Sequence, residues 1–204
     1  MTVPIQRYAI TGGIACGKST VAAWLPLWGG LVLDTDAVGH DLLRAGGAAV
    51  DAIAGAFGRG CLAPDGSVDR GRLGARVFAA ADERFRLNAI LHPLIRRHVD
   101  AWLAAPVPAG VRFQAVLIPL LFEAGWEGPP WDAVIAVVAD EAEQIRRLRG
   151  RGFSDDEARR RVQAQLPCAE KARRADVVIW NNGSLDELRR TAETRFRALL
   201  ERKS

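Results

Sequence analysis

Apolar residues along this chain gather in short runs that are separated by longer helical patterns. The runs contain almost no polar residues, which is typical of strands buried on both faces of a parallel sheet. They are Ala9–Thr11, Leu31–Leu33, Ala115–Ile118, Ala133–Val138 and Val177–Ile179. Because strand runs alternate with helical patterns, the sequence predicts an α/β fold in which helices flank a parallel sheet.

Three helix starts carry the signature of a capping box, an N-cap side chain followed three residues later by glutamate. The pairs are Asp140 with Glu143, Ser154 with Glu157, and Ser184 with Glu187. In each pair, we expect the first side chain to accept a backbone N–H and the acid to reach back to the N-cap.

The pattern changes between Gly39 and Pro106, where it is mainly helical and contains no convincing strand. A turn-rich segment, Ala63–Asp69, interrupts it. At 204 residues and 49% hydrophobic content, the chain can bury the core of one ordinary domain. We therefore predict a single domain, 1–204, with its core in residues 1–38 and 107–204 and a helical insert over about 39–106.

The apolar runs are also too short for a membrane protein, because a bilayer span needs about 18 or more apolar residues. The first seven residues contain no apolar segment of signal-peptide length, so we expect a cytoplasmic protein without a membrane partner. The three cysteines, Cys16, Cys61 and Cys168, are odd in number and far apart. This spacing favours neither a disulfide framework nor a zinc site, and reduced thiols are expected.

The net charge of +4 comes almost wholly from arginine, which is concentrated between Arg146 and Arg174. Such a cluster suits nucleic acid and the phosphates of a small molecule equally well, so charge alone does not choose. The tryptophans are scattered instead of forming a platform for stacked bases. We therefore expect no nucleic-acid partner.

The segment after the first apolar run matches the phosphate-binding motif G-x-x-x-x-G-K-[ST], with Gly12 followed by Gly17, Lys18 and Ser19. Its backbone N–H groups and the following helix would bind the phosphates of a nucleoside triphosphate. Lys18 would bridge the β- and γ-phosphates, the Ser19 hydroxyl would ligate Mg²⁺, and Thr20 would contact the next phosphate. The expected nucleotide-binding residues of this loop are Gly12, Gly13, Ile14, Ala15, Cys16, Gly17, Lys18, Ser19 and Thr20.

Two carboxylates follow the second apolar run, Asp34 and Asp36. At the end of a strand beside such a loop, a carboxylate can accept the proton of an attacking hydroxyl or orient the water shell of a metal. Asp36 can equally cap the next helix. Both interpretations remain open from the residues alone.

Six segments in order resemble the dephospho-CoA kinases, which transfer the γ-phosphate of ATP to the 3′-hydroxyl of dephospho-CoA. They are ITGGIACGKSTVA, LDTDAV, FGRGCLAPDGSVDRGRLGARVF, LHPLIR, PLLFE and AQLPCAEKARRADVVIWNNGS. The resemblance covers nearly the whole chain and implies a P-loop NTPase-type sheet with an arginine-rich lid over about residues 147–166. It also implies ATP and Mg²⁺ as cofactors and dephospho-CoA as the acceptor. We expect a monomer.

The resemblance also implies roles for residues outside the loop. Asp36 matches the proposed general base, and with Lys18 and Arg147 it completes the expected catalytic set. Further ATP contacts are expected from the lid residues Arg147 and Arg151 and, near the adenine, from Asn181 and Gly183. The acceptor pocket is expected at Asp34, Asp36, His92, Pro93, Leu120 and Glu123, with the helical insert as the acceptor-binding part.

This chain departs from the family pattern at three places. Ala15 and Cys16 stand where the family usually has glycine and serine, and we expect a reactive Cys16 thiolate near the helix start, with Cys61 and Cys168 as bystanders. Trp180 replaces a residue that is often acidic, and we expect it to fill the core. The lid segment is one residue shorter, which leaves Arg146 and Arg147 as alternatives for the first lid arginine.

Two rival functions are considered. A kinase for another nucleoside or nucleotide has the same loop and lid. The other is a nucleotide-dependent switch; a GTPase-type switch should show a guanine-reading N-K-x-D segment, which the sequence lacks.

Overall fold

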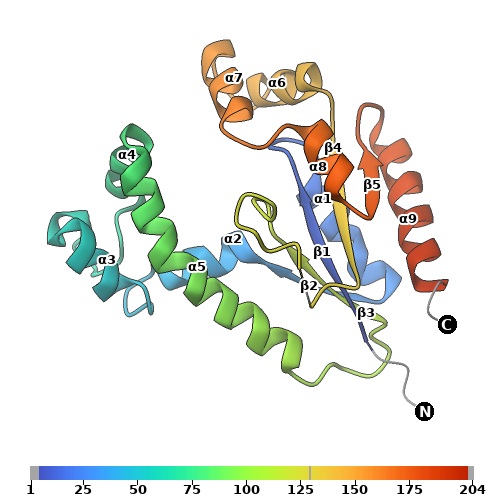
Figure 1. The fold of residues 1–204 in the computed structure, drawn as a ribbon, viewed down its shortest axis with the longest axis horizontal. Coiled ribbons are helices and arrows are strands. Elements are labelled where there is room, and N and C mark those ends of the chain that lie inside the picture. The colour runs from blue at the N-terminus through green and yellow to red at the C-terminus, as the bar shows by residue number, and fades with distance from the viewer. Residues whose placement is uncertain (1–4, 129, 202–204) are drawn as a thin grey trace. The chain divides into compact units, whose positions relative to one another are not determined.

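The computed structural model of this chain describes residues 5–128 and 130–201, apart from the side chains of residues 78, 79 and 81 (Figure 1). The chain divides into two compact units. The first unit contains the chain up to Leu33 and from Val107 onward, and the second unit is Asp34–Pro106.

The first unit is built on a five-stranded sheet with the strand order β2-β3-β1-β4-β5 (Figure 1). The strands are β1 (Gln6–Gly12), β2 (Gly30–Asp34), β3 (Phe113–Leu117), β4 (Ala133–Val138) and β5 (Val177–Trp180). β1 runs parallel to β3 and β4, and β4 runs parallel to β5. Every predicted strand is therefore present, and the parallel α/β fold is confirmed.

The helices of the first unit bury apolar side chains against this sheet, except for the two that directly follow β4, which pack against each other. They are α1 (Lys18–Trp24), η1 (Leu25–Trp28), α6 (Glu141–Arg149), α7 (Asp155–Gln163), α8 (Cys168–Arg174) and α9 (Leu185–Glu201). The rings of Tyr8, Phe113 and Phe196 lie 5.5 to 6.0 Å apart in the core between strands and α9. Aromatic pairs at this spacing add to the free energy that burial provides, which fixes α9 against the sheet.

Two of the three predicted capping boxes are confirmed. Ser154 and Glu157 exchange hydrogen bonds at the start of α7, and Ser184 and Glu187 do the same at the start of α9. The prediction at Asp140 is wrong. Its carboxylate accepts from Asn182 at 2.9 Å, while Glu143 pairs with two arginines of α6.

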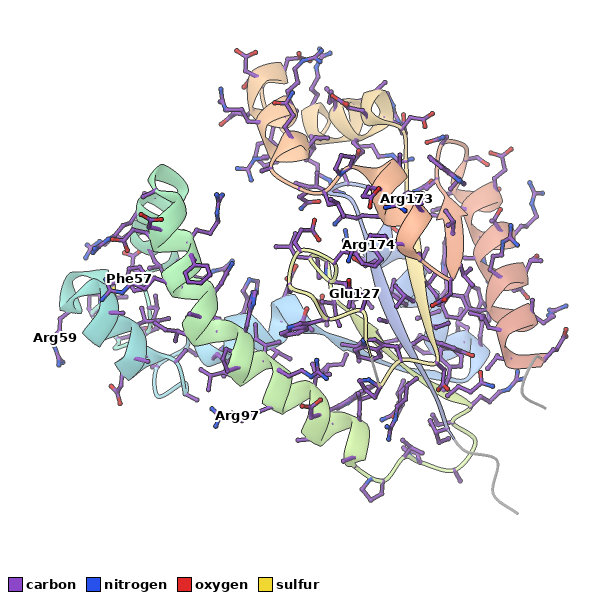
Figure 2. All side chains as sticks on the ribbon, in the orientation of Figure 1. Phe57, Arg59, Arg97, Glu127, Arg173 and Arg174 are labelled. Atoms are coloured by element: carbon purple, nitrogen blue, oxygen red, sulfur yellow. The ribbon has the colours of Figure 1, made fainter. Side chains whose placement is uncertain are left out.

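The second unit consists of helices, with a single isolated bridge between Leu62 and Val68 among its described residues. The helices are α2 (Thr35–Leu42), α3 (Val50–Phe57), η2 (Arg59–Cys61), α4 (Arg70–Ala79) and α5 (Ala81–Ala104). A small apolar cluster around Ile53 and Phe57 holds them together. Figure 2 shows Phe57 on α3, where the Arg76 and Arg86 guanidinium groups lie 5.4 and 5.6 Å from its ring centre.

No helix in the described part of the chain is both long enough and apolar enough to cross a membrane.

Candidate active site

The loop between β1 and α1 has a backbone that only glycine can adopt at two positions. Gly12 has φ +144°, and a Cβ there would lie 1.8 Å from the carbonyl oxygen of Val137. Gly17 has φ +93° at the N-cap of α1, and a Cβ there would lie 2.5 Å from Asn181 Nδ2. The motif glycines are therefore required by close approach of β4 and of the segment after β5.

Each carbonyl oxygen of the loop from residue 12 to residue 16 accepts a hydrogen bond from a side chain. Lys18 Nζ donates to Gly12 (3.0 Å) and Gly13 (2.8 Å), Gln144 Nε2 to Ile14 (2.7 Å), Arg147 Nη1 to Ala15 (3.2 Å) and Asn181 Nδ2 to Cys16 (2.9 Å). These oxygens would repel phosphate if they faced it. Because protein donors engage all five, the loop is suited to an anion.

Arg147 connects three elements of this site. Its guanidinium donates to Glu143 on its own helix at 2.8 Å, to the carbonyl of Ala15, and to the carbonyl of Asn181 at 2.9 Å. Its neighbour Arg146 pairs only with Glu143 among the contacts that the structure gives, and its side chain is 71% exposed against 18% for Arg147. Of the two alternatives, Arg147 is the one that reaches the loop.

Glu143 carries the negative charge of this arginine cluster. Hydrogen bonds from Arg146, together with the positive charge and hydrogen bond of Arg147, lower its pKa to about 2. The carboxylate therefore stays ionised over the physiological range and orients Arg147 toward the loop. Arg151, the second predicted lid arginine, lies exposed in the turn that follows α6.

The segment after β5 contributes Asn181 and Gly183. Asn181 is buried, and its backbone N–H donates to Val138 while its side chain contacts the loop. Gly183 leaves space for the carboxylate of Glu187, which a Cβ would approach to 1.9 Å. Of the residues predicted from the sequence, the structure thus brings the side chains of Lys18, Arg147 and Asn181 together against the loop.

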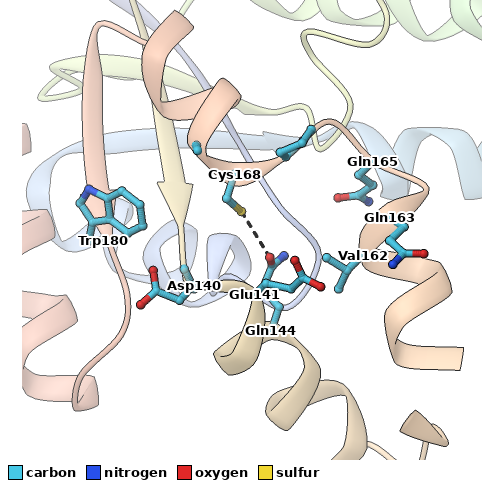
Figure 3. Close-up of a pocket in the computed structure, with 11 residues that line it drawn as sticks. Asp140, Glu141, Gln144, Val162, Gln163, Gln165, Cys168 and Trp180 are labelled. Atoms are coloured by element: carbon cyan, nitrogen blue, oxygen red, sulfur yellow. Dashed lines mark hydrogen bonds between the residues drawn. The ribbon is translucent and has the colours of Figure 1, made fainter. Parts of the chain in front are cut away.

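Trp180 does not fill the core, so that prediction is wrong. Its side chain is 48% exposed, because strand alternation buries Ile179 and turns the next residue to the other face. Trp180 lines a cavity of about 420 Å³ (Figure 3). Asp140, Gln144, Gln165 and Cys168 line it as well.

The turn after β3 carries Leu120 and Glu123, both predicted at the acceptor pocket. Leu120 is 41% exposed. Glu123 Oε1 accepts from Lys171 Nζ at 2.8 Å and from the backbone N–H of Leu166 at 3.0 Å. Lys171 is fully buried and also donates to the carbonyl of Pro119 at 3.1 Å. Glu123 therefore links this turn to α8, and a buried lysine is compensated by two oxygens.

Sequence reasoning missed three residues that support the site: Gln144, Gln165 and Lys171. Gln144 and Gln165 together satisfy Ile14, whose carbonyl accepts from the first and whose N–H donates to the second at 2.9 Å. Gln165 lies inside one of the six family-like segments, which was the available signal. Neither glutamine belongs to a motif with a known spacing to the loop, so pairing them with Ile14 required the fold.

The cysteines behave differently from the prediction. Cys16 is fully buried and its Sγ lies 3.5 Å from Cys168 Sγ. The hydrogen bond with Cys168 and burial raise the pKa of the Cys16 thiol. The prediction of a reactive Cys16 thiolate is therefore wrong. The pKa of Cys168 is lowered, chiefly by its hydrogen bond with Cys16.

In the second unit, Asp34 is the N-cap of α2. Its Oδ1 accepts from the backbone N–H of Asp36 at 2.9 Å, so the capping role belongs to Asp34 and Asp36 stands in the first turn. His92 and Pro93 lie within α5. Burial lowers the pKa of His92, which keeps the ring neutral at pH 7.

The site offers few protein ligands for a magnesium ion. Within residues 5–128 and 130–201, no group of three or more His, Cys, Asp or Glu side chains could hold a metal ion. The Ser19 hydroxyl is exposed in the first turn of α1. One hydroxyl fits Mg²⁺ when phosphate oxygens and water supply the other ligands, as is usual in nucleotide sites.

The family model and the curated relatives indicate one family. The family model described as dephospho-CoA kinase matches residues 7–187. A dephospho-CoA kinase of Geobacillus kaustophilus is 46% identical over 183 residues, which are 89% of this chain and 90% of the relative. A Thermus thermophilus protein of known structure superposes with a TM-score of 0.79 at 35% identity, covering 98% of each chain. The dephospho-CoA kinase of Campylobacter jejuni gives 0.71 at 25% identity, covering 97% of this chain and 98% of its own.

Proposed function

This chain belongs to the dephospho-CoA kinase family, and on that premise we propose a role in the reaction for each residue of the site. The chain is a kinase that uses ATP to phosphorylate dephospho-CoA, the final step of coenzyme A biosynthesis. The observation that carries the assignment of residues is the set of side-chain donors on the loop carbonyls.

We propose that the backbone N–H groups of residues 12–20 bind the phosphates of ATP. Lys18 would exchange its two carbonyl partners for β- and γ-phosphate oxygens, and Thr20 would contact the next phosphate inward. Ser19 would hold Mg²⁺, which when bound neutralises charge on the β- and γ-phosphates. Arg147 would keep the loop in shape from α6, while the exposed Arg151 approaches the triphosphate as the lid closes.

Transfer to the acceptor would follow one displacement. The 3′-hydroxyl oxygen of dephospho-CoA forms a bond to the γ-phosphorus as the bond from that phosphorus to the β,γ-bridging oxygen breaks, and ADP leaves. The hydroxyl proton passes to the carboxylate of Asp36. We assign acceptor binding to the insert, about residues 39–106, with Asp34, His92 and Pro93, and to Leu120 and Glu123 of the first unit. We propose that the catalyst is a monomer.

The acceptor is tested by a coupled ADP-release assay with dephospho-CoA, adenosine, AMP and pantetheine, and with water alone. Turnover that depends on dephospho-CoA is expected. Equal turnover with adenosine or AMP would favour the rival nucleoside or nucleotide kinase, and turnover with water alone would indicate a hydrolytic switch.

The general base is tested by Asp36→Asn, which keeps the size of the side chain and removes its basicity. We expect kcat to fall by about 10²-fold to 10⁴-fold while ATP binding and the melting temperature stay unchanged. Asp41→Asn is the matched control, because Asp41 lies on the same helix and forms only an exposed pair with Arg44 among its given contacts. A near-normal kcat for Asp36→Asn at saturating substrates would remove Asp36 from the mechanism.

A further inference from the structure

Two cysteines 152 positions apart meet beside the phosphate-binding loop. Cys16 Sγ and Cys168 Sγ lie 3.5 Å apart, although the first belongs to the loop and the second begins α8. No disulfide joins them, and both thiols are free. The third cysteine, Cys61, lies buried in the apolar cluster of the second unit.

The sulfur pair is in contact with the parts that shape the loop. A Cβ built on Gly13 would lie 2.5 Å from Cys168 Sγ and 3.0 Å from Cys16 Sγ, so both sulfurs touch the loop backbone there. Cys168 Sγ also contacts Gln144 Oε1 at 3.5 Å, as Figure 3 shows. The other end of that amide donates to the carbonyl of Ile14. Any movement of these sulfurs is therefore transmitted directly to the loop.

The two thiols differ in access to solvent. Cys16 is fully buried, whereas Cys168 is half-buried and lines the cavity of about 420 Å³ drawn in Figure 3. A small oxidant that enters this cavity meets Cys168 first. The lowered pKa of Cys168 adds to this difference, because the thiolate is the form that attacks peroxide.

We propose that Cys16 and Cys168 form a disulfide on exposure to hydrogen peroxide and that this bond reversibly inactivates the kinase. The Cys168 thiolate attacks peroxide, so that an S–O bond forms and the O–O bond breaks; the hydroxide that leaves takes up the proton that the Cys168 thiol lost on ionising and becomes water. The Cys16 thiol then attacks the sulfenic sulfur; the S–S bond forms, the S–O bond breaks, and the thiol proton leaves with the hydroxide as a second water. Two electrons pass from the thiols to one peroxide.

Closing the bond changes the loop. A disulfide has an S–S distance of about 2.05 Å, so the sulfurs must approach by about 1.5 Å from their present separation. Since one sulfur belongs to the loop and both touch Gly13, the phosphate-binding backbone has to shift. A misplacement of about 1 Å at reacting groups costs about 10²-fold in rate, and we expect a loss of that order on oxidation.

The experiment treats the full-length protein with hydrogen peroxide and measures two readouts. Mass mapping without reductant follows a peptide that links Cys16 to Cys168, and the ADP-release assay with dephospho-CoA follows activity before and after dithiothreitol. The wild type is compared with Cys168→Ala and with Cys61→Ala as the matched control for a buried cysteine outside the pair. Each variant is expressed relative to its own reduced activity.

We expect the linked peptide to appear as activity falls about 10²-fold, with dithiothreitol restoring both. Cys61→Ala should be inactivated like the wild type, and Cys168→Ala should resist. The proposal is overturned if no linked peptide forms, if the linked protein keeps full activity, or if Cys168→Ala is inactivated as readily as the wild type. Mass mapping does not depend on the acceptor, so a failure of the assigned function is distinguishable from a failure of this switch.

Discussion

The phosphate-binding loop and the helical unit Asp34–Pro106 are stabilised by contacts of very different range. The loop carbonyl of Ile14 is bound by a residue 130 positions away, and that of Cys16 by one 165 positions away. In the helical unit, the long side chain of Arg76 binds the carbonyl of Phe57, only 19 positions away, and Asp69 caps its own helix. The loop is thus a product of the whole first unit, whereas these two hydrogen bonds of the second unit join residues that are close in sequence.

This difference between the loop and the helical unit indicates which of the two has to be rigid. Stabilising charge in a transition state depends on donors that are already in position, which suits the long-range support of the loop. A unit with a small apolar cluster and local hydrogen bonds opens at a lower free energy. We therefore expect chemistry to be most sensitive at the loop and local opening to be easiest in residues 34–106.

The largest effect on the chemistry is expected at the phosphate-binding loop, from the substitution Lys18→Ala. The substitution removes the charge that would bridge the phosphates, so kcat should fall by about 10²-fold to 10⁴-fold. Steady-state kinetics measure the loss, and circular dichroism checks that the fold remains. Wild-type turnover by a folded Lys18→Ala protein would contradict the assignment of this loop.

The two units can be compared directly with Ile135→Ala in β4 and Ile53→Ala in α3, since both side chains are fully buried. Each truncation should cost about 2 to 5 kcal/mol. Native-state hydrogen exchange should show faster exchange throughout the first unit for Ile135→Ala, but only within residues 34–106 for Ile53→Ala. If Ile53→Ala accelerates exchange in β1 and β4 equally, the units open as one and the comparison fails.

A smaller effect separates the neighbouring arginines of α6. Arg147→Ala removes the donor to the carbonyls of Ala15 and Asn181, which costs about 1 to 3 kcal/mol and should raise the Kd for ATP about 10-fold or more. Arg146→Ala is the matched control, because its exposed side chain contacts only Glu143 among the contacts given. Equal changes in ATP affinity, measured by calorimetry, would argue against a role for Arg147 in shaping the loop.

The smallest effect concerns the charge that orients Arg147. The pKa of Glu143 is about 2 in the folded protein, below its ordinary 4.5, so ionisation of this carboxyl favours the folded state above pH 4.5. That contribution should disappear as pH falls from 4.5 toward 2. It should amount to about 1 kcal/mol, since solvent screens the exposed Arg146. The free energies of unfolding of the wild type and of Glu143→Gln, measured by denaturant titration, should converge over this pH range. A difference between them that stays constant with pH would contradict the prediction.

The fold was predictable because buried parallel strands leave a plain signal. All five strands fall on the apolar runs, with ends that differ by at most three residues, as at Gln6–Gly12 for the run Ala9–Thr11. The capping boxes at Ser154 and Ser184 were predictable for the same reason, since they depend on local spacing. Asp140 failed because Asn182, 42 residues away, competes for its carboxylate.

The candidate site was predictable only in part. Lys18 and Ser19 follow from a motif with fixed spacing, and family-like segments led to Arg147 and Asn181. The sequence did not reveal that Gln144 supports Ile14 or that Cys168 lies against Cys16, because such pairings exist only once β4, α6 and α8 are assembled. Trp180 was misassigned because strand alternation at the end of β5 decided its exposure.

The distance along the chain between the loop and its donors also sets an order of events during translation. Asn181 is added 165 residues after Cys16, a delay of roughly 8 to 33 s at about 5 to 20 residues per second. Until then the nascent chain has the glycines and Lys18 of the loop but lacks the side chain that binds the carbonyl of Cys16. Nucleotide capture on the ribosome is therefore expected late, so ATP can stabilise the finished first unit but cannot guide the beginning of its folding.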